Sequence, residues 1–131
     1  MNIEYSAMHE FAKEELERLF LSVGWSSGRY PEKLVVAMRN YETVYSAWDG
    51  DKLVGLVSVM DDGALNAYIH YLLVDPDYQG YSIGKNLIEM VKEQYKDYLH
   101  VCVIAYNTAV KFYERCGLQV DDVASAMSIW S

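Results

Sequence analysis

The chain has 131 residues, enough for one domain with a substantial core and too few for two. Its net charge of −8, from 19 acidic and 11 basic residues, argues against a nucleic-acid-binding surface, which requires a basic footprint. The first residues show no secretory pattern, and no apolar run approaches a membrane span. We therefore expect a cytoplasmic protein with neither a nucleic-acid nor a membrane partner.

The first half of the chain is predicted to begin with a short strand over residues 2–5 and a helix over residues 9–22. Pro31 suits the first position of a second helix, which runs to Asn40. Trp25 and Tyr30 lie in the loop between these helices. They either line an acceptor pocket or cover the edge of a core, and the second arrangement is the commoner one.

The rest of the chain alternates turn signals with β-branched and aromatic runs, which indicates strands. The predicted strands are 43–48, 53–60, 67–74 and 99–105, and a helix is predicted over residues 83–96. The last two strands should be parallel neighbours, joined by a right-handed crossover through that helix. Residues 1–131 are thus predicted to form a single α+β domain with a mixed sheet.

The two cysteines, Cys102 and Cys116, have no paired spacing. Neither a zinc site nor a disulfide framework follows, and both are predicted to be buried, reduced thiols. No metal is expected.

The stretch from Leu72 to Ile88 contains the first functional signal. An apolar strand stops at Asp75-Pro76, and the next helix begins near Ile83. The stretch Gln79 to Gly84 around that start contains the small residues Gly80, Ser82 and Gly84. Free N–H groups in the first turn of that helix suit a phosphate or pyrophosphate. An ordinary strand-to-helix turn that uses glycine for its geometry is an equally good interpretation of this loop alone.

The second signal is the stretch from Asn107 to Leu118, predicted as a short helix with Asn107 as N-cap and Gly117 as its C-terminal stop. Asn-Thr-Ala-x-x-Phe-Tyr-Glu-x-x-Gly-Leu here, preceded by Leu-x-Val-x-Pro-x-x-Gln-Gly-x-x-x-Gly at Leu72 to Gly84, resembles the GNAT N-acetyltransferase superfamily. The resemblance covers essentially the whole chain. One departure is Ser82, which stands where the family loop usually has glycine; serine is strained there if φ must be positive.

This resemblance implies a GNAT-type, mostly antiparallel sheet with two splayed parallel central strands, flanked by helices. Acetyl-CoA would lie between strands 67–74 and 99–105. Its pantetheine arm would pair with the backbone of Leu72, Leu73 and Val74, and Asn107 would contact that arm or order the loop around it. The pyrophosphate would be cradled by backbone N–H groups of the loop, namely Gln79, Gly80, Tyr81, Ser82, Ile83, Gly84 and Lys85.

The implied reaction is direct attack of an amine on the thioester, with Tyr113 as the general acid that protonates the thiolate. A tyrosine keeps its proton at neutral pH, since its reference pKa is about 10. From spacing alone Tyr113 would be a core residue. His70 is a candidate base, directly or through water, although a strand histidine that faces solvent or a hydrogen-bonded neighbour is the commoner case.

Two functions from different classes follow. The first is an N-acetyltransferase that moves acetyl from acetyl-CoA to an amine, expected to be a small molecule. The alternative is a non-catalytic acyl-CoA-binding sensor or interaction module. A homodimer stays open, and the acceptor amine is not encoded in any motif.

Overall fold

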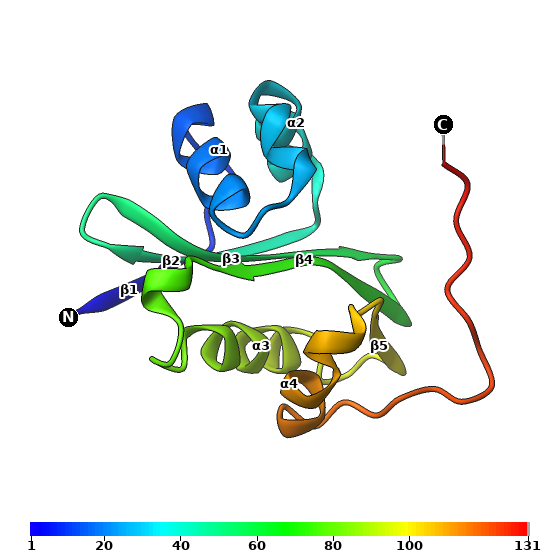
Figure 1. Cartoon of the computed structure of the whole chain (residues 1–131). Helices are drawn as coiled ribbons and strands as arrows, with labels where there is room; N and C mark the ends of the chain where they lie inside the picture. Colours follow the sequence, from blue (N-terminus) through cyan, green and yellow to red (C-terminus); the bar gives the residue numbers. More distant parts are fainter. Residues whose placement is uncertain (131) are drawn as a thin grey trace.

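The computed structural model describes residues 1–130, and its centre is one five-stranded sheet of order β1-β2-β3-β4-β5. Helices α1 and α2 cover one face of this sheet, and α3 and α4 cover the other (Figure 1). The strands are β1 (Ile3–Ser6), β2 (Thr43–Asp49), β3 (Lys52–Asp61), β4 (Asn66–Val74) and β5 (His100–Val103). The α-helices are α1 (Lys13–Ser22), α2 (Pro31–Asn40), α3 (Ile83–Gln94) and α4 (Val110–Arg115).

Most predicted elements are present, with Pro31 and Asn40 bounding α2 as expected. The first helix is shorter than predicted, because residues 9–12 are not helical and α1 begins at Lys13. Tertiary contacts hold this preceding segment against α2. His9 Nδ1 hydrogen-bonds with the Met38 carbonyl at 2.9 Å, and Arg39 donates to the Glu10 carboxylate at 2.9 Å. No helix within residues 1–130 is long and apolar enough to cross a membrane.

The sheet is mixed, as predicted. Strands β1 to β4 pair antiparallel in sequence order, whereas β4 and β5 are parallel. The β4–β5 pairing runs only from Asn66 opposite His100 to Ile69 opposite Val103. Beyond that point, within residues 1–130, β4 continues to Val74 with no strand paired on this side. We call this unpaired side of β4 beyond Ile69 the β4–β5 gap. The predicted strand 99–105 is correspondingly shorter, because residues 104 and 105 already lie beyond the pairing.

Each face of the sheet carries its own apolar core. The α3 side buries Ile83, Leu87, Ile88 and Val91 against the strands, and the α1 and α2 side buries Leu16, Leu19, Phe20 and Met38. Each fully buried side chain of this kind stabilises the fold by about 1.5–3 kcal/mol. Gly55 permits close packing at the start of α3, since a Cβ there would lie 2.9 Å from Ile83 Cγ2.

The C-terminal part begins with α4, which ends at Gly117 as predicted. Gly117 has a φ of +97°, and the Leu118 N–H donates to the Tyr113 carbonyl at 3.0 Å. Leu118 still packs against the α3-side core. Residues 119–130 form no helix or strand and run apart from the body (Figure 1).

Candidate active site

The loop between β4 and α3 presents a row of unused backbone donors. Within residues 1–130, the backbone N–H groups from Gly80 to Lys85 donate to no acceptor. The next N–H along the chain, that of Asn86, donates to the Ser82 carbonyl at 2.9 Å. These donors lie at the N-terminus of a helix spanning Ile83–Gln94, where the helix dipole favours an anion. The loop can therefore receive an anionic group through its backbone.

Ser82 occupies the strained position of this loop. Its φ is +64°, and it is the one non-glycine residue with positive φ in the described chain. Its side chain makes no capping hydrogen bond to α3. The neighbouring Gly80, with φ of +88°, meets the same conformational demand without a Cβ.

Three cations on α3 and α4 form no ion pair in the part of the chain that the structure describes. Among residues 1–130, Lys85, Lys111 and Arg115 form no ion pair, although the chain carries a net charge of −8. All three residues are exposed, on α3 or α4. Unpaired cations on these two helices provide positive charge for an anionic ligand.

Gly84 joins the loop to β4 and α4. A Cβ built on Gly84 would lie 3.2 Å from Phe112 Cζ and 3.7 Å from Val74 Cγ2. The start of α3, the end of β4 and the middle of α4 therefore meet at this residue. Two separate sequence motifs converge in space here.

The end of β4 contributes backbone groups to the gap. Asp75 N–H donates to the Val54 carbonyl at 2.8 Å, and bonded pairs alternate along an antiparallel ladder. Leu73 therefore pairs with β3, while the backbone groups of Leu72 and Val74 point away from β3 into the gap. Gln79 Nε2 donates to the Val74 carbonyl at 3.2 Å, so one of these acceptors is already engaged. Of the three strand residues predicted to pair with a ligand, Leu73 is turned the other way.

Tyr113 combines a buried ring with an unpaired hydroxyl. The residue is 9% exposed and packs in the α3-side core, with its ring edge-on to Phe112. Its hydroxyl makes no hydrogen bond within residues 1–130. Every buried side-chain oxygen or nitrogen in that range does have a hydrogen-bond partner. The hydroxyl must therefore reach accessible space. Burial raises the pKa of Tyr113 to about 12, so the phenol stays protonated.

His70 lies in a separate aromatic cluster on the other side of β4. Its ring stacks on Tyr71 with centroids 4.3 Å apart, and its Nδ1 hydrogen-bonds with the Tyr41 hydroxyl. His70 falls at a β-bulge opposite Ser58 and Val59, which places it beside Tyr71. Partial burial lowers the pKa of His70, because desolvation disfavours the imidazolium.

Two predictions about local structure are wrong. Asn107 does not cap α4 with its side chain; it begins a 3₁₀ turn over Asn107–Ala109, and α4 starts three residues later at Val110. The tighter turn moves Asn107 away from the capping position, and its side chain is exposed. Cys102 is only half buried, because it lies on the edge strand β5, whereas Cys116 is buried as predicted; both are free thiols.

Asp75 is a supporting residue that motif reasoning missed. Its buried carboxylate accepts from the Asp77 N–H at 2.9 Å and forms an ion pair with Arg18 at 3.3 Å. These contacts fix the exit of β4 against α1 immediately before the loop. The Asp-Pro pair marked this turn in the sequence, but nothing there indicated a partner 57 positions away.

A hollow of about 240 Å³ opens beside the aromatic cluster of His70, Tyr71 and Tyr41. It lies between the α1–α2 connection, α2 and β4. It is lined by Ser27, Tyr30, Lys33, Leu34, Ala37 and Tyr71. The Ser27 hydroxyl hydrogen-bonds with that of Tyr71 at 2.9 Å. Trp25 packs edge-on against Phe20 and therefore covers a core edge, whereas the exposed Tyr30 lines the hollow.

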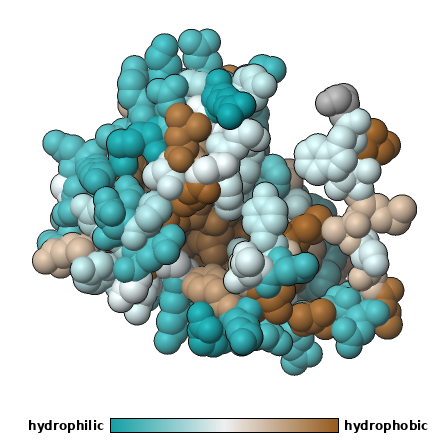
Figure 2. All heavy atoms as spheres, in the orientation of Figure 1, coloured by the Kyte–Doolittle hydropathy of each residue, from teal (hydrophilic) through white to brown (hydrophobic). Residues whose placement is uncertain are grey.

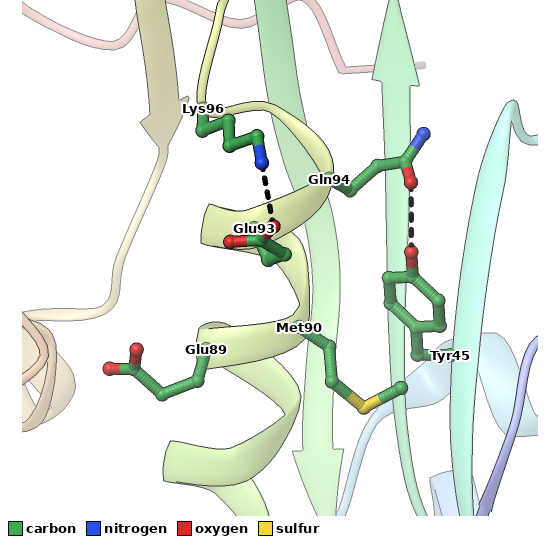
Figure 3. Close-up of a pocket in the computed structure, with 6 residues that line it drawn as sticks. All are labelled: Tyr45, Glu89, Met90, Glu93, Gln94 and Lys96. Carbon is green, nitrogen blue, oxygen red and sulfur yellow. Dashed lines mark hydrogen bonds and ion pairs between the residues drawn. The ribbon is translucent and has the colours of Figure 1, made fainter.

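A larger and more open hollow, about 550 Å³, lies between α3 and β2, away from these residues (Figure 3). Four of its polar groups form two pairs: Tyr45 donates to Gln94 at 3.2 Å, and Lys96 donates to Glu93 at 2.9 Å. It contains none of the loop donors, and neither α4 nor β4 lines it. Size alone therefore does not identify the active site here.

Comparisons with known proteins define the class. Residues 11–125 match the acetyltransferase (GNAT) domain. The chain is 29% identical over 98% of its length to a chloroplastic GCN5-related N-acetyltransferase of Arabidopsis thaliana, and 30% identical over 88% to a histone acetyltransferase of Glycine max. A GNAT-family acetyltransferase from Streptococcus pneumoniae superposes with a TM-score of 0.79 at 26% identity, covering 99% of this chain and 98% of the other.

The chain belongs to the GNAT acetyltransferase family, which confirms the resemblance and the predicted fold. It spans 58% and 55% of the lengths of the two plant relatives. One of these is named chloroplastic, and the cytoplasmic location predicted for this chain stays a prediction.

Proposed function

We propose that the chain is an acetyl-CoA-dependent N-acetyltransferase acting on the amine of a small molecule. The observation that carries this proposal is the row of unpaired N–H groups from Gly80 to Lys85 beside the β4–β5 gap. Acetyl-CoA supplies an acetyl group activated as a thioester. The loop donors and the unpaired Lys85 suit its pyrophosphate, and the gap suits an extended arm.

The backbone of β4 would orient the arm. Leu72 and Val74 turn their backbone groups into the gap, where an N–H can donate to a carbonyl oxygen as negative charge develops on it. These donors are held by the ladder to β3 and need no rearrangement. Asn107, exposed on the 3₁₀ turn, is free to bind the arm or the loop around it.

Tyr113 would act on the thioester sulfur, which leaves as a thiolate when the amine displaces it. With a pKa of about 12 its phenol holds its proton more firmly than a thiol of reference pKa about 8.5. Its contribution therefore begins as hydrogen-bond donation to the sulfur, and proton transfer follows only as negative charge accumulates there. The unpaired hydroxyl above a buried ring supports this assignment.

His70 would accept the proton of the incoming amine, directly or through water. The lowered pKa keeps the imidazole neutral at pH 7, as a base requires. The tautomer matters: Nδ1–H must donate to the Tyr41 oxygen, which leaves Nε2 free to accept. With the reverse tautomer the free nitrogen carries a proton, and His70 then has no role as a base.

The acceptor would enter by the hollow lined by Tyr30, Lys33 and Tyr71, next to the His70 cluster. Its aromatic walls and hydroxyls can hold a compact amine with an apolar body. A protein amine is a second candidate acceptor, because one relative is named a histone acetyltransferase.

Thiol release from acetyl-CoA is the test, measured with polyamines, amino acids, aminosugars, arylalkylamines and peptide N-termini. We expect amine-dependent thiol release with at least one small amine and an acetylated product by mass spectrometry. Binding of acetyl-CoA without turnover on any amine would favour the non-catalytic acyl-CoA sensor instead. Failure to bind acetyl-CoA would contradict both functions.

A further inference from the structure

The hollow between the α1–α2 connection, α2 and β4 contains a positive charge that nothing in its lining neutralises. Its charged lining residue is Lys33, and no lining residue is acidic. Within residues 1–130 Lys33 forms no ion pair, although the chain carries a net charge of −8. An ammonium without a counter-ion in an acidic chain is available to an anion from solution.

The positive charge extends to the segment around the hollow. Residues 26–40 contain three cations and a single acid. Glu32 and Arg39 form ion pairs with residues that precede α1 or begin it. Arg29 and Lys33 are left without an ion pair in the described chain. The opposite wall of the hollow, β4, carries no acidic residue, so neither wall supplies a carboxylate to Lys33.

The Tyr30 ring holds Lys33 at the rim of the hollow. Lys33 Nζ lies 5.6 Å from the ring centroid, within the range of a cation–π attraction, and both side chains are exposed. On the same face of α2, Leu34 is buried and Ala37 is half-buried. Figure 2 shows a largely hydrophilic surface over α1 and α2, with apolar side chains between these helices and the sheet. The hollow therefore has a cationic rim and an apolar interior.

The two hydroxyl groups of Ser27 and Tyr71 provide a further donor in the hollow. They hydrogen-bond with each other at 2.9 Å, and neither has another partner in the described residues. One hydroxyl donates to the other, so the proton of the second stays free to donate. An ammonium and a hydroxyl proton in one hollow are suited to an anionic oxygen.

We propose, on the basis of the proposed function, that the acceptor is a compact amine that also carries a carboxylate or phosphate, and that Lys33 selects it by binding this anionic group. At about 240 Å³ the hollow is smaller than the roughly 300–1,000 Å³ of sites for drug-sized ligands, so the acceptor is compact. Lys33 takes no part in the acetyl transfer itself.

The same charge orients the acceptor. Lys33 attracts the anionic group and repels the ammonium, so the amine end lies away from the rim. It then faces the wall at Tyr71, whose ring stacks on that of His70 with centroids 4.3 Å apart. A polyamine or a basic peptide brings further positive charge to the rim, and both are therefore disfavoured acceptors.

The experiment compares amines that differ only in the anionic group. One pair is O-phosphoethanolamine and ethanolamine, and the other is tyrosine and tyramine, so the two pairs separate phosphate from carboxylate. Binding is measured by calorimetry with CoA present, which carries no acetyl group to transfer. We expect the anionic member of at least one pair to bind about tenfold more tightly, since a hydrogen bond to a charged group is lost in its partner. In NMR spectra the amides of Lys33 and Tyr71 should shift.

Variants of Lys33 test the residue itself. Lys33→Gln should abolish the preference and leave the affinity for the uncharged member nearly unchanged, whereas Lys33→Arg should keep most of the preference. Lys96→Gln removes the same charge from an exposed site in the larger hollow and is the matched control, with the preference expected to stay as in wild type.

Equal affinities within both pairs, no binding of either anionic ligand, or tighter binding of spermidine than of both would overturn the proposal. So would a Lys33→Gln variant that keeps the preference. Thiol release from acetyl-CoA separates this proposal from the proposed function. Selective binding of the anionic ligands without thiol release supports the role of Lys33 and contradicts the acetyltransferase activity alone. Thiol release that is faster with the uncharged member of each pair overturns the role of Lys33 alone.

Discussion

Gly84 and Phe112 touch: a Cβ added to Gly84 would lie 3.2 Å from Phe112 Cζ, so the backbone at the start of α3 packs directly on the α4 ring. This contact makes a substitution at Gly84 a poor probe of ligand charge, because any side chain also disturbs α4 and Tyr113 beside Phe112. A clean probe has to leave this contact intact.

Lys85 provides that probe. Lys85→Glu places a negative charge beside the loop donors without a packing change, since Lys85 is exposed and unpaired in the described residues. The melting-temperature rise caused by acetyl-CoA should shrink, because the carboxylate repels the pyrophosphate. Lys96→Glu, beyond the other end of α3, makes the same charge change as a control. If the melting-temperature rise caused by acetyl-CoA shrinks equally in both variants, the cofactor does not bind beside Lys85.

Ser82→Gly should stabilise the free protein. The left-handed backbone at Ser82 costs a non-glycine residue about 1–2 kcal/mol, and its side chain caps nothing. We expect urea unfolding to show a gain of about 1 kcal/mol. Ser82→Ala keeps the strain and loses the hydroxyl, so its stability should match wild type. If glycine brings no gain, the loop relaxes without cost when serine is present.

Tyr113→Phe isolates the hydroxyl. Because that hydroxyl makes no hydrogen bond within residues 1–130, folding stability and the Kd for acetyl-CoA should change little. A positioned acid contributes about a hundredfold or more, so kcat should fall by that factor, roughly 3 kcal/mol. Tyr45→Phe, whose hydroxyl bonds Gln94 in the other hollow (Figure 3), is the control. Turnover within a few-fold of wild type would make Tyr113 a core residue only.

The pH dependence tests His70. Its pKa is lowered by burial, so a base at this position gives kcat/KM an acid limb below pH 6.5. Activity should be full above that limb and fall as the imidazole gains a proton. The same shift makes folding less stable as pH falls below 6.5, because the unfolded chain binds the proton more readily. His70→Gln should lose both effects.

Tyr41→Phe distinguishes a base from a structural histidine. The expected wild-type tautomer has Nδ1–H donating to Tyr41, which ¹⁵N NMR of the imidazole can read directly. Removing the Tyr41 oxygen should move the acid limb with little change in acetyl-CoA affinity. If the wild-type spectrum shows the proton on Nε2, His70 does not accept the proton from the amine.

The fold was largely predictable because the elements carry their own signals. Pro31 and Asn40 bound α2 as expected, and Gly117 takes a positive φ at the predicted C-terminal stop of α4. The errors lie where tertiary contacts decide. Arg39 and Met38 hold residues 9 and 10 out of the helix, and β5 stops at Val103 because β4 diverges there.

The candidate site was predictable in its loop and not in its surroundings. The Gln79-to-Gly84 pattern indicated free N–H donors because glycines and a helix start are local features. Burial of the Tyr113 ring, the Tyr41–His70 bond and the Asp75–Arg18 ion pair depend on residues far apart in the chain. No spacing rule connects them, so only the structure brings them together.

An NMR titration of the ¹⁵N-labelled chain with acetyl-CoA shows directly whether the cofactor binds at the β4–α3 loop. We expect the backbone amides of Gly80 to Lys85 to shift most, followed by those of Leu72 and Val74, because their N–H groups gain acceptors. Amides around Tyr45 and Gln94 in the larger hollow should stay in place. If that hollow responds while the amides of Gly80 to Lys85 do not move, the cofactor does not bind at the β4–α3 loop.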